Sequence, residues 1–185
     1  MSIAQSRKNG KSKWGSKSEA QETKIPAEEA AEIEPFARNA AKEGMEVLHD
    51  SGRTRLLGVS NMTFEQLQSL CEKARIRPRF VQNRCYAVRQ WDRLIREFCA
   101  ANDIIYKGFS LLTGNRDVMA SPELAQIAKR HGRTVSQIVF RFALDVGMLP
   151  LTGTTDADHM RLDLDLFDFR LEPAELQMIE RLASP

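Results

Sequence analysis

Arg55-Leu56-Leu57-Gly58-Val59-Ser60-Asn61 is the first of four short apolar segments that end in small or polar residues. The other three are Phe80-Val81-Gln82-Asn83-Arg84, Ile104-Ile105-Tyr106-Lys107-Gly108-Phe109-Ser110 and Met148-Leu149-Pro150-Leu151-Thr152-Gly153-Thr154-Thr155. Short continuous apolar runs are typical of parallel strands that are covered on both faces. Amphipathic helices are expected between them, so the alternation predicts a parallel β/α architecture whose strand ends share one edge.

Helix boundaries are marked by capping residues and glycines. Thr63 with Gln66, and Thr134 with Gln137, form two capping boxes, and Ser121 precedes a proline in a first helical turn. Further helices are expected from Trp91 to about residue 101, from about Asp156, and over 173–183. An earlier helix is predicted by an apolar face that contains Ala37, Ala40, Ala41, Met45 and Leu48.

Residues 1–36 differ from the rest in composition. A basic, serine-rich start is followed by an acidic stretch from Glu19 to Glu34, and hydrophobic residues are sparse. Segregated charge with low hydrophobicity predicts a disordered leader, followed by one folded domain over 37–185. An organelle transit segment is the weaker interpretation because the amphipathic arginine pattern of such segments is absent.

Composition excludes several classes of function. Lys and Arg number 27 against 25 Asp and Glu, a net charge of +2 that argues against a nucleic-acid binder. No apolar run approaches the roughly 20 residues of a membrane helix. The three cysteines show no pairing pattern and no metal-ligand spacing with the three histidines, so buried reduced thiols, no metal site and a cytoplasmic protein are expected.

Three motifs in a fixed order resemble the second half of an aldo-keto reductase. They are Gly58-Val59-Ser60-Asn61, Gly108-Phe109-Ser110 and Pro150-Leu151-Thr152-Gly153-Thr154-Thr155. The resemblance extends from about Met45 to the C-terminus and implies a TIM barrel of the aldo-keto reductase type. Only four strands are predicted here, a half-barrel, and a closed eight-stranded barrel typically takes about 250 residues.

The resemblance implies a nicotinamide site at the ends of the first three strands. Ser60 and Asn61 correspond to the pair that binds the nicotinamide carboxamide, and Asn83 takes the nicotinamide-facing position of the next strand. Phe109 corresponds to the aromatic residue that stacks on the nicotinamide ring. Ser110 and Leu112 correspond to residues that line the pyrophosphate in the family.

The fourth strand implies the adenosine end of the same site. A strand that ends in small residues and feeds a helix offers free N–H groups to a phosphate. The implied residues there are Gly153, Thr154, Thr155, His159, Arg161 and Asp163. The resemblance implies NADP(H), while NAD(H) stays open because Gly153 and His159 replace the cations usual in the family.

No catalytic residue is assigned in this chain. The resemblance implies an NAD(P)H-dependent oxidoreductase that reduces aldehydes and ketones, but the family's catalytic Tyr, Asp, Lys and His belong to the barrel's first half. A small carbonyl substrate is therefore expected only if a catalytic half is supplied. The alternatives are a non-catalytic nucleotide-binding or interaction protein that forms a homodimer, a truncated gene product, and a different phosphate-binding barrel.

Overall fold

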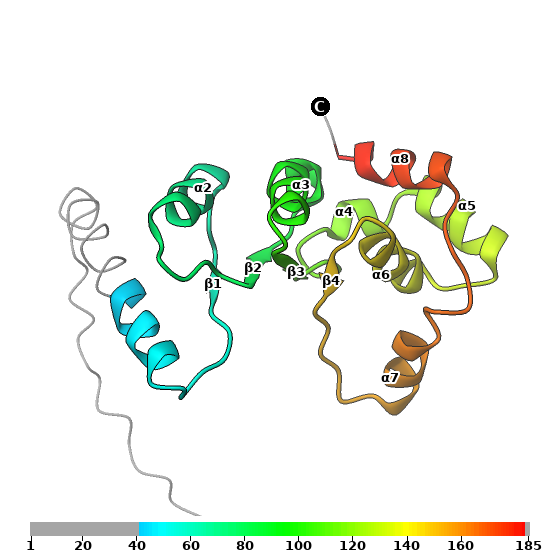
Figure 1. The fold of residues 1–185 in the computed structure, drawn as a ribbon. Coiled ribbons are helices and arrows are strands. Elements are labelled where there is room, and N and C mark those ends of the chain that lie inside the picture. Colours follow the sequence, from blue (N-terminus) through cyan, green and yellow to red (C-terminus); the bar gives the residue numbers. More distant parts are fainter. Residues whose placement is uncertain (1–40, 184–185) are drawn as a thin grey trace, which may run out of the picture. The chain divides into compact units, whose positions relative to one another are not determined.

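A four-stranded parallel sheet organises the chain (Figure 1). The computed structural model describes residues 41–183, which belong to the unit Ala40–Pro185. The predicted leader 1–36 and the positions Ala37 and Ala40 lie outside the described residues. The strands are β1 (Gly58–Ser60), β2 (Phe80–Arg84), β3 (Ile105–Phe109) and β4 (Leu149–Pro150), and they pair in sequence order.

The central strands match the predicted segments, and the outer strands are shorter than predicted. β1 has three residues because its register with β2 begins at Gly58 opposite Phe80. β4 has two, since Pro150 has no N–H to donate, although the Leu151 N–H still donates to the Gly108 carbonyl at 2.8 Å.

The two faces of the sheet differ in burial. Val81 and Asn83 of β2 and Tyr106 and Gly108 of β3 are buried, and the residues between them in sequence are half-buried or exposed. Period-two alternation therefore points one face toward the helices, where α3 packs on β3 and α6 on β4. On the opposite face the Lys107 ammonium lies 4.6 Å from the centre of the Phe80 ring.

Helices separate the strands as predicted. They are α2 (Phe64–Lys73), α3 (Arg93–Ala101), α4 (Arg116–Met119), α5 (Pro122–His131), α6 (Val135–Asp145), α7 (Ala157–Leu164) and α8 (Pro173–Arg181). Both predicted capping boxes are present, and the Ser121 hydroxyl accepts the Leu124 N–H. Gly132 ends α5 at φ 61°, a left-handed conformation that favours glycine.

The core lies between the sheet and the helices. Its largest fully buried side chains include Trp91, Tyr106, Phe142, Leu67 and Leu124. The three cysteines are buried and unpaired, as predicted. Between residues 41 and 183 there is no helix both long enough and apolar enough to cross a bilayer.

The apolar face predicted for the earlier helix is not buried in the structure. Residues 41–50 are helical, but Met45 and Leu48 are 41% and 37% exposed. The buried side chain is Glu46, whose carboxylate accepts the backbone N–H groups of Arg75 at 3.0 Å and Ile76 at 3.2 Å. This helix is therefore attached to the rest by polar contacts at the end of α2.

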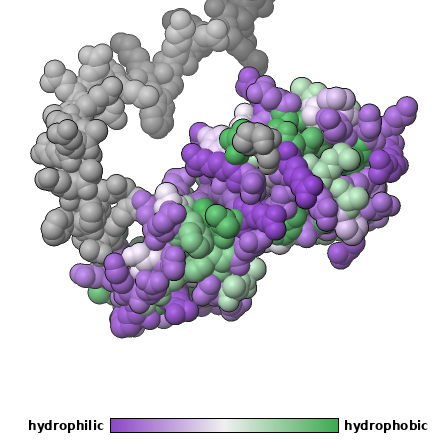
Figure 2. All heavy atoms as spheres, turned by 90° about the horizontal axis from the view of Figure 1, so that it is seen from above, coloured by the Kyte–Doolittle hydropathy of each residue, from purple (hydrophilic) through white to green (hydrophobic). Residues whose placement is uncertain are grey.

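Exposed hydrophobic side chains are widespread on the described residues. Figure 2 shows hydrophobic residues gathered on separate parts of one face, with hydrophilic residues between them. The most exposed large ones are Val47, Val88, Leu94, Leu164 and Phe167, each above 60%.

Candidate functional site at the carboxyl ends of the strands

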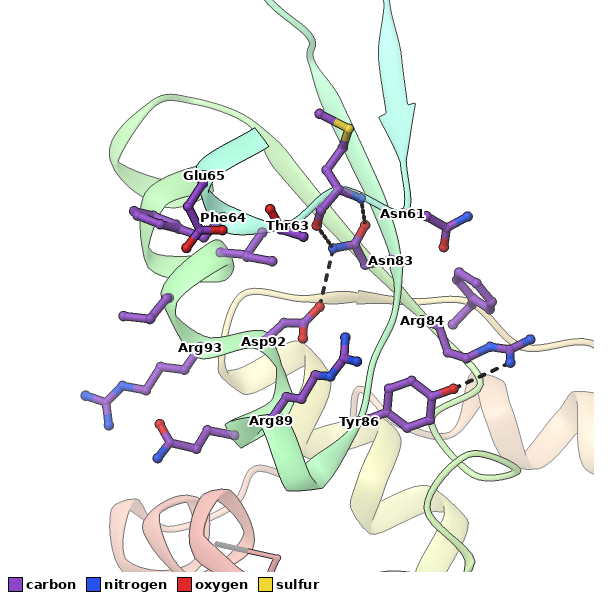
Figure 3. Close-up of a pocket in the computed structure, with 15 residues that line it drawn as sticks. Asn61, Thr63, Phe64, Glu65, Asn83, Arg84, Tyr86, Arg89, Asp92 and Arg93 are labelled. Atoms are coloured by element: carbon purple, nitrogen blue, oxygen red, sulfur yellow. Dashed lines mark hydrogen bonds between the residues drawn. The ribbon is translucent and has the colours of Figure 1, made fainter. Parts of the chain in front are cut away.

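A pocket of about 630 Å³ opens at the carboxyl ends of β1, β2 and β3 (Figure 3). Asn61, Asn83 and Phe109 line it, and all three were assigned to the nucleotide site from the sequence. The other walls come from the start of α2, the start of α3 and the segment that follows β2. Parallel strands thus bring together residues that are far apart in the sequence.

Ser60 and Asn61 are held against the next strand through one carbonyl. The Gln82 carbonyl accepts the Ser60 hydroxyl at 2.9 Å and the Asn61 N–H at 3.0 Å. Asn61 has φ 55°, a conformation that asparagine adopts more readily than most residues. Its exposed side chain reaches the pocket wall, so a donor and an acceptor are presented there.

Asn83 has a structural role in the sheet. Its Oδ1 accepts the Met62 N–H at 3.0 Å and its Nδ2 donates to the Met62 carbonyl at 2.8 Å (Figure 3). Nδ2 also lies 3.4 Å from Asp92 Oδ2, and the residue is 5% exposed. The amide therefore joins β2 to the segment after β1, although one edge of it still faces the pocket.

The end of β3 presents an aromatic ring and a tight turn. Phe109 is half-buried, with the Arg84 guanidinium 5.5 Å from its ring centre. Ser110 has φ 58°, and its carbonyl accepts the Gly114 N–H at 2.9 Å. A Cβ at Gly114 would lie 2.8 Å from that carbonyl oxygen, so the turn requires glycine. Leu112 packs against the hydrophobic core.

The segment after β4 lies apart from this pocket. Gly153, Thr154 and Thr155 lead into α7, but none of them lines the pocket. Asp156 caps the helix, and its Oδ1 accepts the N–H groups of Asp158 at 2.8 Å and His159 at 3.0 Å. Those N–H donors hold the pKa of the Asp156 carboxyl below its ordinary value. An anionic side chain thus occupies the position that the sequence offers to a phosphate.

Of the remaining candidates on α7, Arg161 has a charged partner. His159 is exposed and Asp163 is half-buried. The Arg161 guanidinium pairs with Asp158 at 3.0 Å, with both side chains largely exposed. The structure therefore gathers Asn61, Asn83 and Phe109 in one pocket, and leaves the adenosine-end candidates on a separate strand end.

A nicotinamide nucleotide fits one end of this edge better than the other. The exposed amide of Asn61 is suited to a carboxamide, and the ring of Phe109 is suited to stacking on a planar ring. The start of α7 carries two carboxylates, Asp156 and Asp158. Their negative charge disfavours the binding of an additional phosphate there.

The two tyrosines differ in their access to the pocket, because Tyr106 is buried and Tyr86 is half-buried. The Tyr106 hydroxyl donates to Asp92 Oδ2 at 2.7 Å, and the ring is 1% exposed. Burial, together with Cys85 and Asp92, raises the pKa of Tyr106 far above its ordinary value. Tyr86 lines the pocket, with its hydroxyl 3.5 Å from an Arg84 nitrogen.

The segment over 90–92, which contributes Gln90 and Asp92 to the pocket wall, is not predicted by the sequence. Gln90, Trp91 and Asp92 are consecutive residues with φ between 52° and 54°, a left-handed run that costs about 1–2 kcal/mol per residue. Trp91 is fully buried and its indole N–H donates to the Ile179 carbonyl at 3.0 Å. Because tertiary anchoring imposes this conformation, no local signal in the sequence predicts it.

Comparisons with known proteins agree with this architecture. Residues 22–184 match the Aldo/keto reductase family. The chain is 34% identical over 157 residues to (1S)-1,7-diacetoxy-luvungin A aldo-keto reductase of Citrus sinensis, covering 82% of this chain and 49% of that protein. The chain thus spans about half the length of the curated relatives it matches.

Solved structures give the same assignment of the fold. An aldo/keto reductase from Brucella melitensis superposes with a TM-score of 0.66 at 25% identity, covering 76% of this chain and 53% of that one. The silkworm Bombyx mori aldo-keto reductase AKR2E5, solved in complex with NADPH, superposes at 0.69, covering 76% of this chain and 46% of that one. Its 20% identity supports the fold alone. With its parallel sheet, its motif order and its match over residues 22–184, this chain belongs to the aldo/keto reductase family.

Proposed function

We propose that this chain binds a nicotinamide nucleotide along the carboxyl ends of β1–β4, as the cofactor-binding half of an NAD(P)H-dependent oxidoreductase. The observation that carries the proposal is the convergence of Asn61, Asn83 and Phe109 on one pocket. When bound, the nucleotide supplies a hydride for reduction of an aldehyde or ketone. The substrate is a small carbonyl compound, and its turnover depends on a catalytic acid that we do not assign to any residue here.

The candidate residues at the ends of β1, β2 and β3 have separate roles in this proposal, although Ser60, Ser110 and Leu112 do not line the pocket itself. Ser60 and Asn61 bind the carboxamide, and Phe109 stacks on the nicotinamide ring. Ser110 and Leu112 shape the path of the pyrophosphate, since the Ser110 carbonyl is fixed by the Gly114 N–H. Asn83 acts on the site through its two bonds to Met62, which position the segment that follows Asn61.

The adenosine end decides between NADPH and NADH. Family membership supports NADPH, whereas Asp156 and the Arg161–Asp158 pair oppose an extra phosphate at α7. Gly153, Thr154 and Thr155 then approach the adenosine through backbone groups, with His159, Arg161 and Asp163 on the adjoining helix. Both nucleotides belong in the first experiment.

A homodimer is part of the same proposal. Among the described strands, β1 pairs only with β2 and β4 only with β3, so each has an edge without a strand neighbour. Unpaired edges favour association with another chain. Sedimentation velocity with and without NADPH is expected to show a two-chain species, and a single-chain species in both conditions would contradict this part.

Isothermal titration with NADPH and NADH tests the proposed site. Phe109→Ala is expected to weaken binding about five- to tenfold through loss of ring stacking, while Phe109→Tyr retains it. Phe167→Ala is the matched control because that ring is 75% exposed and does not line the pocket. Equal affinities for the wild-type chain and Phe109→Ala would contradict the placement of the nicotinamide.

A further inference from the structure

Four side chains of the pocket alternate between aromatic rings and guanidinium groups. The Arg84 guanidinium lies 5.5 Å from the centre of the Phe109 ring, and one of its nitrogens is 3.5 Å from the Tyr86 hydroxyl. The Arg89 guanidinium lies 5.5 Å from the centre of the Tyr86 ring. We call Phe109, Arg84, Tyr86 and Arg89 the aromatic–arginine row; three of its members are labelled in Figure 3.

The row is held in place by the backbone around it. Arg84 ends β2 opposite Phe109 of β3 in the parallel register. The Tyr86 carbonyl accepts the N–H groups of Arg89 at 3.0 Å and Trp91 at 3.1 Å, which fixes the turn that carries Arg89. The Tyr86 ring also lies over Gly114, where an added Cβ would approach its Cε1 to 3.3 Å.

The positive charge of the row is not neutralised within the described residues. No carboxylate of residues 41–183 lies within 4 Å of the Arg84 or Arg89 guanidinium. Arg93, the third arginine of the pocket, differs because its Nε lies 2.7 Å from Glu97. Asp92 also lines the pocket and is 8% exposed, and its Oδ2 accepts hydrogen bonds from the Tyr106 hydroxyl and the Asn83 amide instead of from an arginine of the row.

Stacking leaves the binding edges of a guanidinium available. An aromatic ring contacts the flat face of the group, while its five N–H donors point outward in its plane. That arrangement is suited to bidentate contacts with a carboxylate or phosphate, and the rings offer a surface for a planar ligand. Two cations around one tyrosine also repel each other, and a bound anion relieves that repulsion.

We propose that the aromatic–arginine row binds the oxyanion of a ligand that also carries a planar ring. The proposal rests on the row itself. The identity of the ligand rests on the proposed function, because Phe109 is also the ring assigned to the nicotinamide. A carboxylate on the carbonyl substrate and a phosphate of the nucleotide are the two sources of such an anion.

Binding of benzoate to the full chain, followed by NMR titration, tests the row without any reaction. Benzamide is the neutral probe of the same shape. Benzoate is expected to bind at least tenfold more tightly than benzamide and to weaken as salt is added, because the contact is ionic. Arg84→Gln and Arg89→Gln are each expected to weaken benzoate binding about tenfold.

Arg93→Gln is the matched control, since Arg93 lines the same pocket but is paired with Glu97. It is expected to change benzoate affinity less than twofold. Equal affinities for benzoate and benzamide, or equal losses in Arg84→Gln, Arg89→Gln and Arg93→Gln, would overturn the proposal. All three arginines are exposed, so the substitutions leave the core intact.

Repeating the titration with saturating NADPH distinguishes the two sources of the anion. Unchanged or tighter benzoate binding assigns the row to a substrate carboxylate. Competition by NADPH that free nicotinamide does not reproduce assigns it to a nucleotide phosphate. Different results would contradict the proposed function and the proposal for the aromatic–arginine row. Benzoate binding without NADPH binding would refute the proposed function alone, and the reverse would refute the row alone.

Discussion

At the scale of single residues, the largest difference from the sequence-based assignment concerns Asn83. The sequence places an amide at the end of a strand, which suits a ligand contact. The structure shows the same amide closing two hydrogen bonds with the Met62 backbone in a position that is 5% exposed. The sequence does not show that Asn83 bridges two neighbouring strand ends, because its partner Met62 comes close only in the folded structure.

Asn83→Ala is therefore expected to lower stability as well as any nucleotide affinity. Loss of both bonds to Met62 should reduce the free energy of unfolding by about 1–3 kcal/mol, measured by urea denaturation. Gln82→Ala is the control, since that side chain is on the opposite side of the same strand and only its backbone carbonyl bonds to Ser60 and Asn61. Equal stability of the two variants would show that the Asn83 amide is not a structural contact.

Glu175 gives a pH dependence at the same scale. It is 2% exposed, and its Oε2 accepts the Glu172 N–H at 2.9 Å while Arg130 and His131 contact the carboxylate. Burial alone would raise the pKa of the Glu175 carboxyl, but the Glu172 N–H, His131 and Arg130 together bring it below the ordinary value of 4.5. Native contacts therefore favour the charged form.

A carboxyl whose native pKa is depressed stabilises the fold above its unfolded pKa and ceases to do so as the pH falls through the native value. The free energy of unfolding is expected to decrease as the pH is lowered below about 4.5, with a smaller decrease in Glu175→Gln. Urea denaturation across this range measures it. Glu123→Gln, an exposed residue in the first turn of α5, is the control, and an identical slope in Glu175→Gln and wild type would refute the assignment.

At the scale of elements, local rules identify helix starts well and strand lengths poorly. Thr63, Ser121 and Thr134 cap the helices that the sequence predicts, because each cap involves residues within three positions. β1 and β4 are shorter than predicted, and both are outer strands among those described. The helix at 41–50 buries Glu46 where the pattern favoured Met45 and Leu48, since burial depends on what packs against the helix.

The start of α7 provides a prediction at this scale. Asp156→Asn keeps an Oδ1 that can accept the Asp158 and His159 N–H groups, but removes the negative charge. NADPH affinity is expected to rise about two- to fivefold with little change for NADH, because the helix start then favours a phosphate. Asp165→Asn, at the other end of α7, is the control. A rise of equal size for both nucleotides would contradict the assignment of this strand end to the adenosine phosphate.

At the scale of the whole molecule, the order of the elements was predictable and the arrangement of the pocket was not. Four apolar segments with helices between them predict a parallel sheet, and the strands pair in that order. Gln90 and Asp92 of the pocket wall flank Trp91, whose indole N–H bonds to α8 across 88 positions of the sequence.

Reduction of a carbonyl group by NADPH also requires an acid that donates a proton to the product oxygen. With NADPH and a small aldehyde, the chain alone is expected to show no NADPH oxidation above the blank, because the Tyr106 hydroxyl is buried and donates to Asp92. The assay follows NADPH absorbance, with NADPH binding measured on the same sample. Turnover that is lost in Tyr86→Phe would instead identify the pocket tyrosine as the acid.

The most direct test of the central claim is a crystal structure of the chain with NADPH. The nicotinamide ring is expected on the face of Phe109, with its carboxamide within hydrogen-bonding distance of Ser60 or Asn61. A nucleotide bound away from the carboxyl ends of β1–β4, or crystals that contain no nucleotide at saturating concentration, would contradict it.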